Sequence, residues 1–185
     1  MTIEELTDIV NNCSKCSLYK TRTNCVVGDG NINSPIMLIG EAPGEQEDLQ
    51  GKAFVGKSGM LLDKMLMSIG LDRSKVYICN IIKCRPPGNR NPARDEEDAC
   101  MDYLREQYKI MRPKIVVLLG SVACKAVIKR DFSIMKNHGE VIKRSEVMFL
   151  PTFHPSALLR DPSKKILAWH DLQKLKRLIE SHLSV

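Results

Sequence analysis

The chain has 185 residues, 43% of them hydrophobic, and its 28 lysines and arginines against 22 aspartates and glutamates give a net charge of +6. This size and composition fit one globular domain and exclude a disordered chain, and no apolar run approaches the roughly 20 residues of a membrane span. The N-terminal segment carries acids and lacks the basic stretch that opens a secretory signal, so we expect a cytoplasmic protein. The mild positive charge is compatible with a polyanionic partner.

Helices and strands alternate along the sequence. A capping-box pattern at Thr2 and Glu5 precedes an apolar stripe and predicts a short helix. Residues 35–40 are an apolar run closed by glycine, which is typical of a buried parallel strand. Residues 41–57 are rich in Gly, Glu and Pro without helical periodicity, and we expect a loop there. Ser58 is then expected to cap a second helix.

The same patterns predict the remaining elements. In chain order they are a strand over 76–82, a turn over 85–91, a helix from Pro92 to about Met111, a strand over 114–119, a helix over 121–130, a strand over 147–153 and a helix from Pro162 to about Leu183. Alternating strands and helices favour α/β architecture. We therefore expect residues 1–185 to form a single three-layer domain with a central, mostly parallel four-stranded sheet.

Ligands bind in such sheets at the carboxyl ends of the strands. The segments that follow the four predicted strands are 40–48, 80–91, 120–123 and 154–159. Most of the chemically unusual residues of the chain lie in the first, second and fourth of these segments. We therefore expect the functional site to be built from those three.

The seven cysteines point to metal chemistry. An odd number in a chain without a secretory signal argues against a disulfide framework and leaves ligation of zinc or of an iron–sulfur cluster. Cys13 and Cys16 form a C-x-x-C pair, whereas Cys84 and Cys100 lie apart, in a turn and in a helix. This spread favours a cluster over the paired knuckles that are common for zinc. The alternative, buried free thiols, suits the other three cysteines, Cys25, Cys79 and Cys124.

Two residues of the predicted first loop are candidates for the site. Glu41 suits a place near developing positive charge or beside a water molecule, whereas Glu45 and Asp48 are compatible with a merely solvated acidic loop. Phe54 stands in a glycine-bearing loop and could stack on a base or anchor the loop in the core. Residues 54–59 lack the spacing of a phosphate-binding loop, so nucleotide hydrolysis is not indicated.

A polar group also closes the second predicted strand. The planar amide of Asn80 offers one donor and one acceptor, which can match the polar edge of a pyrimidine, unless it only satisfies the strand end. Lys83, Arg85 and Arg90 follow within a few residues. These three cations could contact phosphates, or they could form a solvated basic turn.

The segment after the last predicted strand combines a histidine with two leucines. His154 is a candidate acid or hydrogen-bond donor, although a single histidine is often structural. Leu158 and Leu159 beside Arg160 suggest an apolar wedge that enters DNA next to a phosphate contact. The alternative is an ordinary helix start in which one of the leucines belongs to the core.

Together these segments resemble the family 4 uracil-DNA glycosylases of bacteria and archaea. The matching stretches are GEAPGEQED, FVGKSGMLL, NIIKCRPPGNRNP and FHPSALLR, and they occur in the order and spacing of that family. The pattern of Cys13, Cys16, Cys84 and Cys100 matches as well. The resemblance implies that these four cysteines hold a structural [4Fe–4S] cluster.

The resemblance also implies roles for individual residues of the site. Glu41 belongs to the loop that holds the catalytic water, and Phe54 stacks on the flipped uracil. Asn80 pairs with the uracil edge, and His154 donates a hydrogen bond to a uracil oxygen. These assignments agree with the chemistry that the residue types alone allow.

Three further residues are assigned to the substrate pocket, namely Ala42, Glu47 and Asn89, with Glu47 as the candidate that excludes the methyl group of thymine. Contacts to DNA are expected from Arg85, Arg90, Leu158 and Arg160. The sequence departs from the family at Lys52-Ala53, where Arg-Pro is frequent, and this should affect only loop stiffness. It also lacks the His-containing insertion of a related branch that links covalently to DNA, so that chemistry is not expected.

The expected activity is that of a monofunctional glycosylase. It flips uracil from single- or double-stranded DNA, hydrolyses the N-glycosidic bond with water, and leaves an abasic site. Lys83 is not expected to act as an amine nucleophile, because it lies three residues past Asn80 and points to the opposite face of an extended strand. We expect a monomer. There are two rival classes. One is a non-enzymatic nucleic-acid-binding module with a cluster or zinc, and the other is a redox protein. Neither class has a use for the two pocket residues Asn80 and His154.

Overall fold

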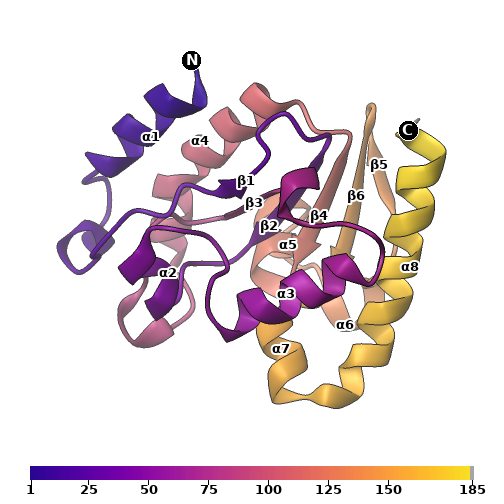
Figure 1. Cartoon of the computed structure of the whole chain (residues 1–185). Helices are drawn as coiled ribbons and strands as arrows, with labels where there is room; N and C mark the ends of the chain where they lie inside the picture. Colours follow the sequence, from indigo (N-terminus) through magenta and orange to yellow (C-terminus); the bar gives the residue numbers. More distant parts are fainter. Residues whose placement is uncertain (184–185) are drawn as a thin grey trace.

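A twisted six-stranded sheet lies between two layers of helices in the computed structural model, which describes residues 1–183 (Figure 1). Four strands run parallel in the order β3–β2–β4–β6, and antiparallel β1 and β5 close the two edges. The strands are β1 Asp29–Gly30, β2 Ile36–Gly40, β3 Tyr77–Asn80, β4 Ile115–Leu119, β5 Ile142–Arg144 and β6 Val147–Thr152. The predicted α/β class and its four parallel strands are confirmed. The two edge strands were not predicted, because two or three residues are too few to reveal an alternating pattern.

The helices are α1 Ile3–Asn11, α2 Glu45–Gln50, α3 Lys57–Met67, α4 Arg94–Met111, α5 Ser121–Val127, α6 Ile134–Asn137, α7 Pro155–Arg160 and α8 Lys165–His182. The predicted capping box of α1 is confirmed, with both Thr2–Glu5 hydrogen bonds present. Two predicted starts move by a residue or two. Gly56 rather than Ser58 caps α3, and α4 begins after Ala93. No helix among residues 1–183 has both the length and the apolar character that crossing a membrane requires.

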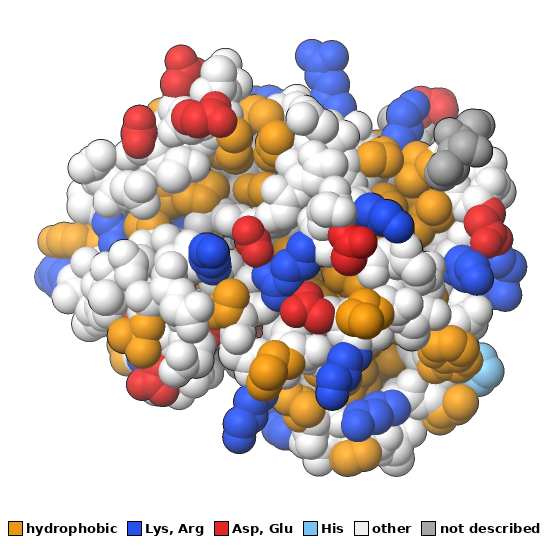
Figure 2. Space-filling model, viewed as in Figure 1, with side chains coloured by type: hydrophobic (Ala, Val, Ile, Leu, Met, Phe, Trp, Pro, Cys, Tyr) orange, Lys and Arg blue, Asp and Glu red, His pale blue; other side chains and the backbone are white. Residues whose placement is uncertain are grey.

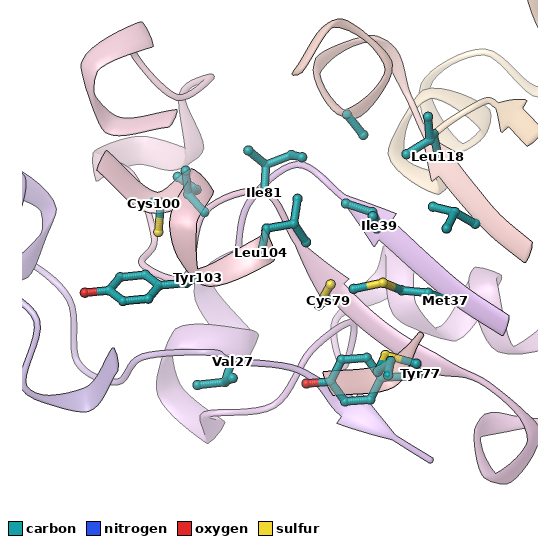
Figure 3. Close-up of a cluster of buried hydrophobic side chains, with 14 of the residues drawn as sticks. Val27, Met37, Ile39, Tyr77, Cys79, Ile81, Cys100, Tyr103, Leu104 and Leu118 are labelled. Carbon is teal, nitrogen blue, oxygen red and sulfur yellow. The ribbon is translucent and has the colours of Figure 1, made fainter. Parts of the chain in front are cut away.

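Each of the four parallel strands sends alternate side chains into two separate cores. Met37 and Ile39 of β2 belong to the core that α1, α4 and α5 cover, and Figure 3 shows this side of the sheet. Ile36 and Leu38 of the same strand point to the other core, which α3, α7 and α8 cover. The near-continuous apolar strands follow from burial on both faces, as parallel sheets require. The sheet is therefore a rigid, dry platform for the loops at its ends.

The prediction that residues 41–57 form only a loop is wrong, because α2 lies within them. The Glu47 side chain accepts a hydrogen bond from Gly44 N–H at 3.1 Å, which starts the helix, and Gly51 ends it with a φ of 69°. The helix has only six residues, and its buried side chains include the carboxylates Glu47 and Asp48. No apolar periodicity marks it, which is why the sequence pattern did not reveal it.

The order of the parallel strands places a ligand site at their carboxyl ends. The chain passes from β2 outward to β3 and then crosses back over β2 to β4. In open α/β sheets a crevice forms where the strand order reverses in this way. Gly40 closes β2, Asn80 closes β3, and His154 follows β6. The three polar segments predicted to form a site therefore all begin at the same edge of the sheet.

Candidate active site

A cleft of about 510 Å3 opens at the carboxyl ends of β2, β3 and β6. It brings together most of the predicted site residues, which are Glu41, Ala42, Glu47, Phe54, Asn80, Asn89, Arg90, His154 and Arg160. Arg85 and Leu158 are not among the residues that line it. The cleft is large enough for a nucleobase with part of its sugar, since small-molecule sites typically measure about 300–1,000 Å3.

Asn80 is a buried amide without a partner. Its side chain lies at the floor of the cleft, and the residue is 1% exposed. Its Oδ1 is the one buried side-chain polar atom in the described part of the chain that has no hydrogen bond. A buried polar atom without a partner costs about 1–3 kcal/mol. Such a cost is typical of a functional position, where a ligand donor completes the hydrogen bond.

Phe54 packs against Asn80 across Gly40. A Cβ atom at Gly40 would lie 2.5 Å from Asn80 Oδ1 and 2.6 Å from Phe54 Cζ, so only glycine allows the close approach. Phe54 is 4% exposed and adopts a φ of 54°, in the left-handed region that side chains disfavour. Phe54 is anchored in the core and also lines the cleft, so the expected anchoring is confirmed and stacking on a base stays a prediction.

Arg73 fixes the unusual backbone of Phe54, and the sequence analysis missed it. Its guanidinium donates hydrogen bonds to the carbonyl oxygens of Ala53, at 2.8 Å, and of Phe54. Asp29 and Asp63 hold it in turn, with N–O distances of 2.8 Å. Arg73 stands in a short helical turn before β3 without a motif around it, so nothing in the sequence marks it. Its role depends on segments brought together only by folding.

His154 is held as a neutral hydrogen-bond donor. It caps α7, and its Nδ1 accepts a hydrogen bond from Ser156 N–H at 3.1 Å. Because Nδ1 is the acceptor, the ring proton of the neutral form lies on Nε2. Burial, with a smaller contribution from the charge of Arg160, lowers the pKa of His154 to about 4. The ring centroid lies 5.5 Å from that of Phe54, so the two rings line the cleft together.

Glu41 directly follows β2 and lies half-buried in the cleft. Burial raises the pKa of its carboxyl, the charge of Glu97 raises it further, and Arg160 lowers it. A carboxylate held partly out of water beside a polar cleft can accept a proton from water or face a developing positive charge. Both were the roles expected from the sequence.

Glu47 joins two loops around the cleft. Its Oε1 accepts hydrogen bonds from Val55 N–H and Gly56 N–H, both at 2.8 Å, while Oε2 accepts from Gly44 N–H. The residue therefore ties the start of α2 to the loop that carries Phe54. Of the two acids that were compatible with a merely solvated loop, Asp48 does not face solvent. Asp48 is 3% exposed and accepts hydrogen bonds from the backbone of residues 23 and 24.

The predicted cations differ in how free they are to meet a phosphate. Arg90 forms a two-pronged ion pair with buried Glu96, at 2.8 and 2.7 Å, which neutralises much of its charge. Arg85 donates to Asn89 Oδ1 at 2.7 Å. Arg160 is exposed at the cleft. On the face seen in Figure 2, acidic and basic side chains are interspersed.

Two of the expected contacts with DNA do not agree with the structure. Lys83 is 1% exposed, so it is not a phosphate contact. Leu158 is also 1% exposed and packs in the core beneath α7, so it is not a wedge in this conformation. Leu159, its neighbour, is 44% exposed. The sequence pair did not reveal which leucine faces water, because α7 is only six residues long.

We expect Leu159→Ala to lower uracil excision from double-stranded DNA by about 10–100-fold, the equivalent of burying one leucine. Excision from single-stranded DNA should change little, because it has no duplex stack in which the wedge would take the place of the flipped nucleotide. Single-turnover rates on the two substrates measure the difference. Leu158→Ala is the matched control and should instead lower the free energy of unfolding by about 2–5 kcal/mol. Equal losses for Leu159→Ala on both substrates would contradict a wedge.

A second pocket contains the four predicted ligand cysteines. Cys13 and Cys16 come from the segment after α1, Cys84 from the segment after β3 and Cys100 from α4, and all four line one pocket. Arg22 donates a hydrogen bond to Cys84 Sγ at 3.3 Å, and Lys15 N–H donates to Cys13 Sγ at 3.5 Å. Contacts with Cys25 and Arg22 lower the pKa of Cys84 to about 6.

The donor set of this pocket fits a group held by thiolates. N–H donors around the sulfurs stabilise negative charge, as in iron–sulfur sites. The described residues contain no group of three or more His, Cys, Asp or Glu side chains close enough together to hold one metal ion. Cys25, for which a buried free thiol was the alternative, has its Sγ 3.9 Å from Cys84 Sγ.

The fold and the cleft define an α/β protein with a polar cleft, large enough for a small planar ligand, at the switch point of its sheet. Comparison with protein families agrees, because the model of the uracil DNA glycosylase superfamily matches residues 27–173. The similar proteins include a type-4 uracil-DNA glycosylase of Thermotoga maritima, 42% identical over 97% of both chains. That of Sulfurisphaera tokodaii is 41% identical over 96% of this chain and 84% of the relative. The chain therefore belongs to the uracil DNA glycosylase superfamily, and within it to the type-4 family.

Proposed function

We propose that this protein excises uracil from DNA by hydrolysing the N-glycosidic bond and leaves an abasic site. The observation that carries the proposal is the buried, unpartnered Oδ1 of Asn80 at the floor of the cleft. Uracil presents an N–H between two carbonyl oxygens, so an amide can accept from the N–H and donate to one oxygen. Cytosine presents an acceptor and an amino donor at these positions and would leave buried groups unpaired.

Neutral His154 supplies the second interaction with the base. As the glycosidic bond breaks, negative charge develops on the uracil oxygens, and the Nε2–H of His154 can donate to one of them. A donor of this kind is worth roughly 3–4 kcal/mol in a transition state. Because the pKa of His154 is lowered to about 4, it acts as a donor rather than as an acid at neutral pH.

Water is the nucleophile in this proposal, with Glu41 as its partner. The half-buried carboxylate lines the cleft, where it could orient the water or stabilise positive charge that develops on the sugar. Lys83 is unsuited to attack the sugar, since it is buried and its Nζ donates to Asn80 O and Gln107 Oε1. We therefore propose a monofunctional enzyme in which water attacks the sugar, and neither Lys83 nor Lys57 of the cleft lining does so. Glu47, Asn89 and Ala42 shape the pocket around the base.

Incubation with uracil-containing single- and double-stranded DNA tests the activity. We expect free uracil and an alkali-labile abasic site, and we expect borohydride to trap no covalent complex. A trapped complex would contradict the monofunctional assignment, and its loss in Lys57→Ala or in Lys83→Ala would identify the attacking amine. Absence of uracil release on both substrates would overturn the proposed function as a whole.

We further propose that the cofactor is a [4Fe–4S] cluster held by Cys13, Cys16, Cys84 and Cys100, and that the protein acts on DNA as a monomer. The supporting observation is the convergence of the four sulfurs, with their N–H donors, on one pocket. When bound, such a cluster ties three distant segments of chain together. No residue of the base-binding cleft is among its ligands.

Iron analysis of anaerobically purified protein tests the cofactor. We expect a brown protein with broad absorption at about 400 nm and about four irons per chain. Colourless protein with stoichiometric zinc would contradict it. A non-enzymatic nucleic-acid-binding module or an electron-transfer protein would also hold such a group. Neither would need the unpartnered amide of Asn80 facing a neutral histidine.

A further inference from the structure

Lys83 is the largest of the side chains that are less than 2% exposed in the described residues. It belongs to the segment between Asn80, at the floor of the cleft, and Cys84, in the four-cysteine pocket. It also lines the cysteine pocket itself. A long cationic side chain is therefore buried between the two sites that the proposed function uses.

The ammonium group of Lys83 is held by neutral oxygens. Its Nζ donates to the backbone oxygen of Asn80 and to Gln107 Oε1, both at 2.6 Å. Gln107 is oriented in turn, because its Nε2 donates to Val27 O at 2.8 Å and to Tyr77 Oη at 2.9 Å. No ion pair within residues 1–183 includes Lys83. The network thus fixes the geometry of the cation without neutralising its charge.

A buried charge without a counter-charge is strongly unfavourable, so buried charges are normally paired. The anionic candidates beside Lys83 are the cysteine sulfurs. The backbone of Lys83 forms a hydrogen bond with Cys100, and both residues line the cysteine pocket. Four thiolates around an iron–sulfur core leave a net negative charge. The cluster pocket is therefore the source of the missing counter-charge.

We propose that Lys83 is a positioning residue that couples the cluster to base recognition. Its ammonium group balances the negative charge of the cluster, and the same group holds the backbone oxygen of Asn80, so that the end of β3 keeps the Asn80 amide aimed into the cleft. The proposal rests on the proposed function, since it needs both the cluster and the excision of uracil. In this proposal the cluster helps to position Asn80 for binding the base, although no cluster ligand lines the cleft.

Lys83→Met tests the coupling, because it removes the charge and keeps the length of the side chain. We expect the iron content to stay near that of the unmodified protein, since the four thiolates remain. The reduction potential of the cluster should become more negative, because loss of a nearby cation makes addition of an electron less favourable. The single-turnover rate of uracil release should fall about 10–100-fold, as for other residues that orient ligands, with little change in DNA affinity.

Two further variants separate charge from position. Lys15 also lines the cysteine pocket but is exposed, so Lys15→Met is the matched control and should change the potential and the rate little. Gln107→Glu places a carboxylate on Lys83 and should shift the potential in the same negative direction while keeping the bond to Asn80. It should therefore cost less rate than Lys83→Met. If Lys83→Met folds poorly, Lys83→Gln, which also removes the charge and keeps an N–H donor, provides the potential in its place.

The reduction potentials are measured by protein-film voltammetry, on the one-electron couple that the cluster displays. Equal potentials in Lys83→Met or Gln107→Glu and the unmodified protein would overturn the coupling. An unchanged rate of uracil release in Lys83→Met, together with a shifted reduction potential, would also overturn the coupling. Failure of the proposed function is recognised separately in the unmodified protein, as absence of iron or absence of uracil release.

Discussion

Alanine in place of Asn80 or of His154 is expected to lower the single-turnover rate of uracil release by about 10²–10³-fold, with DNA affinity nearly unchanged. The reason is that both side chains act on charge that exists only in the transition state. Asn80→Ala removes the buried amide that has no protein partner at its Oδ1, and His154→Ala removes the Nε2–H donor. The measurement pairs single-turnover rates with equilibrium binding to uracil-containing DNA.

The control for these variants is His170→Ala, which removes an exposed histidine of α8 outside the cleft and should leave both rate and affinity unchanged. A loss of DNA affinity in Asn80→Ala or His154→Ala that accounts for the whole loss of activity would contradict the assigned roles. The two losses should be less than additive if both groups stabilise the same charge on the base.

The pH dependence of the same rate distinguishes a neutral donor from an acid. The folded pKa of His154 is lowered from its usual 6.5 to about 4, so the neutral donor form predominates well above pH 4. His154 should therefore not impose a loss of rate between about pH 5 and 8. An acidic limb should come from Glu41, whose pKa burial raises, and Glu41→Gln should abolish that limb. An acidic limb near pH 6.5 that persists in Glu41→Gln would show that His154 titrates normally.

The position of the site could be predicted from the sequence because it depends on strand ends. Glu41, Asn80 and His154 each follow or close a buried apolar run, and the carboxyl ends of parallel strands meet at one edge of a sheet. The convergence of these three residues on one cleft needed only the element types and their parallel order. Their chemical roles came from residue types and from the family resemblance.

Burial within short segments could not be predicted in the same way. Leu158 and Leu159 look alike in sequence, yet one is 1% and the other 44% exposed. Asp48 and Lys83 look like solvated charges, yet both are buried. A helix of six residues or a turn offers too few positions for a periodic pattern to show its inner face.

The supports of the site also escaped the sequence analysis, because they act across long sequence separations. Arg73 holds the backbone of Phe54 from 19 residues away, and Gln107 reaches Lys83 across 24. The tautomer of His154 depends on the backbone N–H of Ser156, which any residue except proline would provide. Neither kind of contact leaves a motif, since each is defined by folded geometry.

Loss of one cluster ligand should remove the folded state rather than the chemistry alone. Cys84 lies between β3 and α4, and the other three ligands come from the segment after α1 and from α4. The proposed cluster would join these three segments beside the N-terminal part of the first core, and metal binding of this kind contributes directly to folding. The lost contribution is comparable to the whole stability of a domain, about 5–15 kcal/mol, so we expect Cys84→Ala to give insoluble or unfolded protein without iron.

Cys124→Ala is the matched control, because Cys124 is also buried, in α5, but does not line the cysteine pocket. Removing its sulfur should lower the free energy of unfolding by about 1 kcal/mol, as for other small deletions in a core, and should leave the iron content unchanged. Soluble yield, iron content and Tm of the two variants measure the contrast. A Cys84→Ala protein that kept the Tm of the unmodified protein and lost only uracil excision would show that the cluster serves the reaction and not the fold.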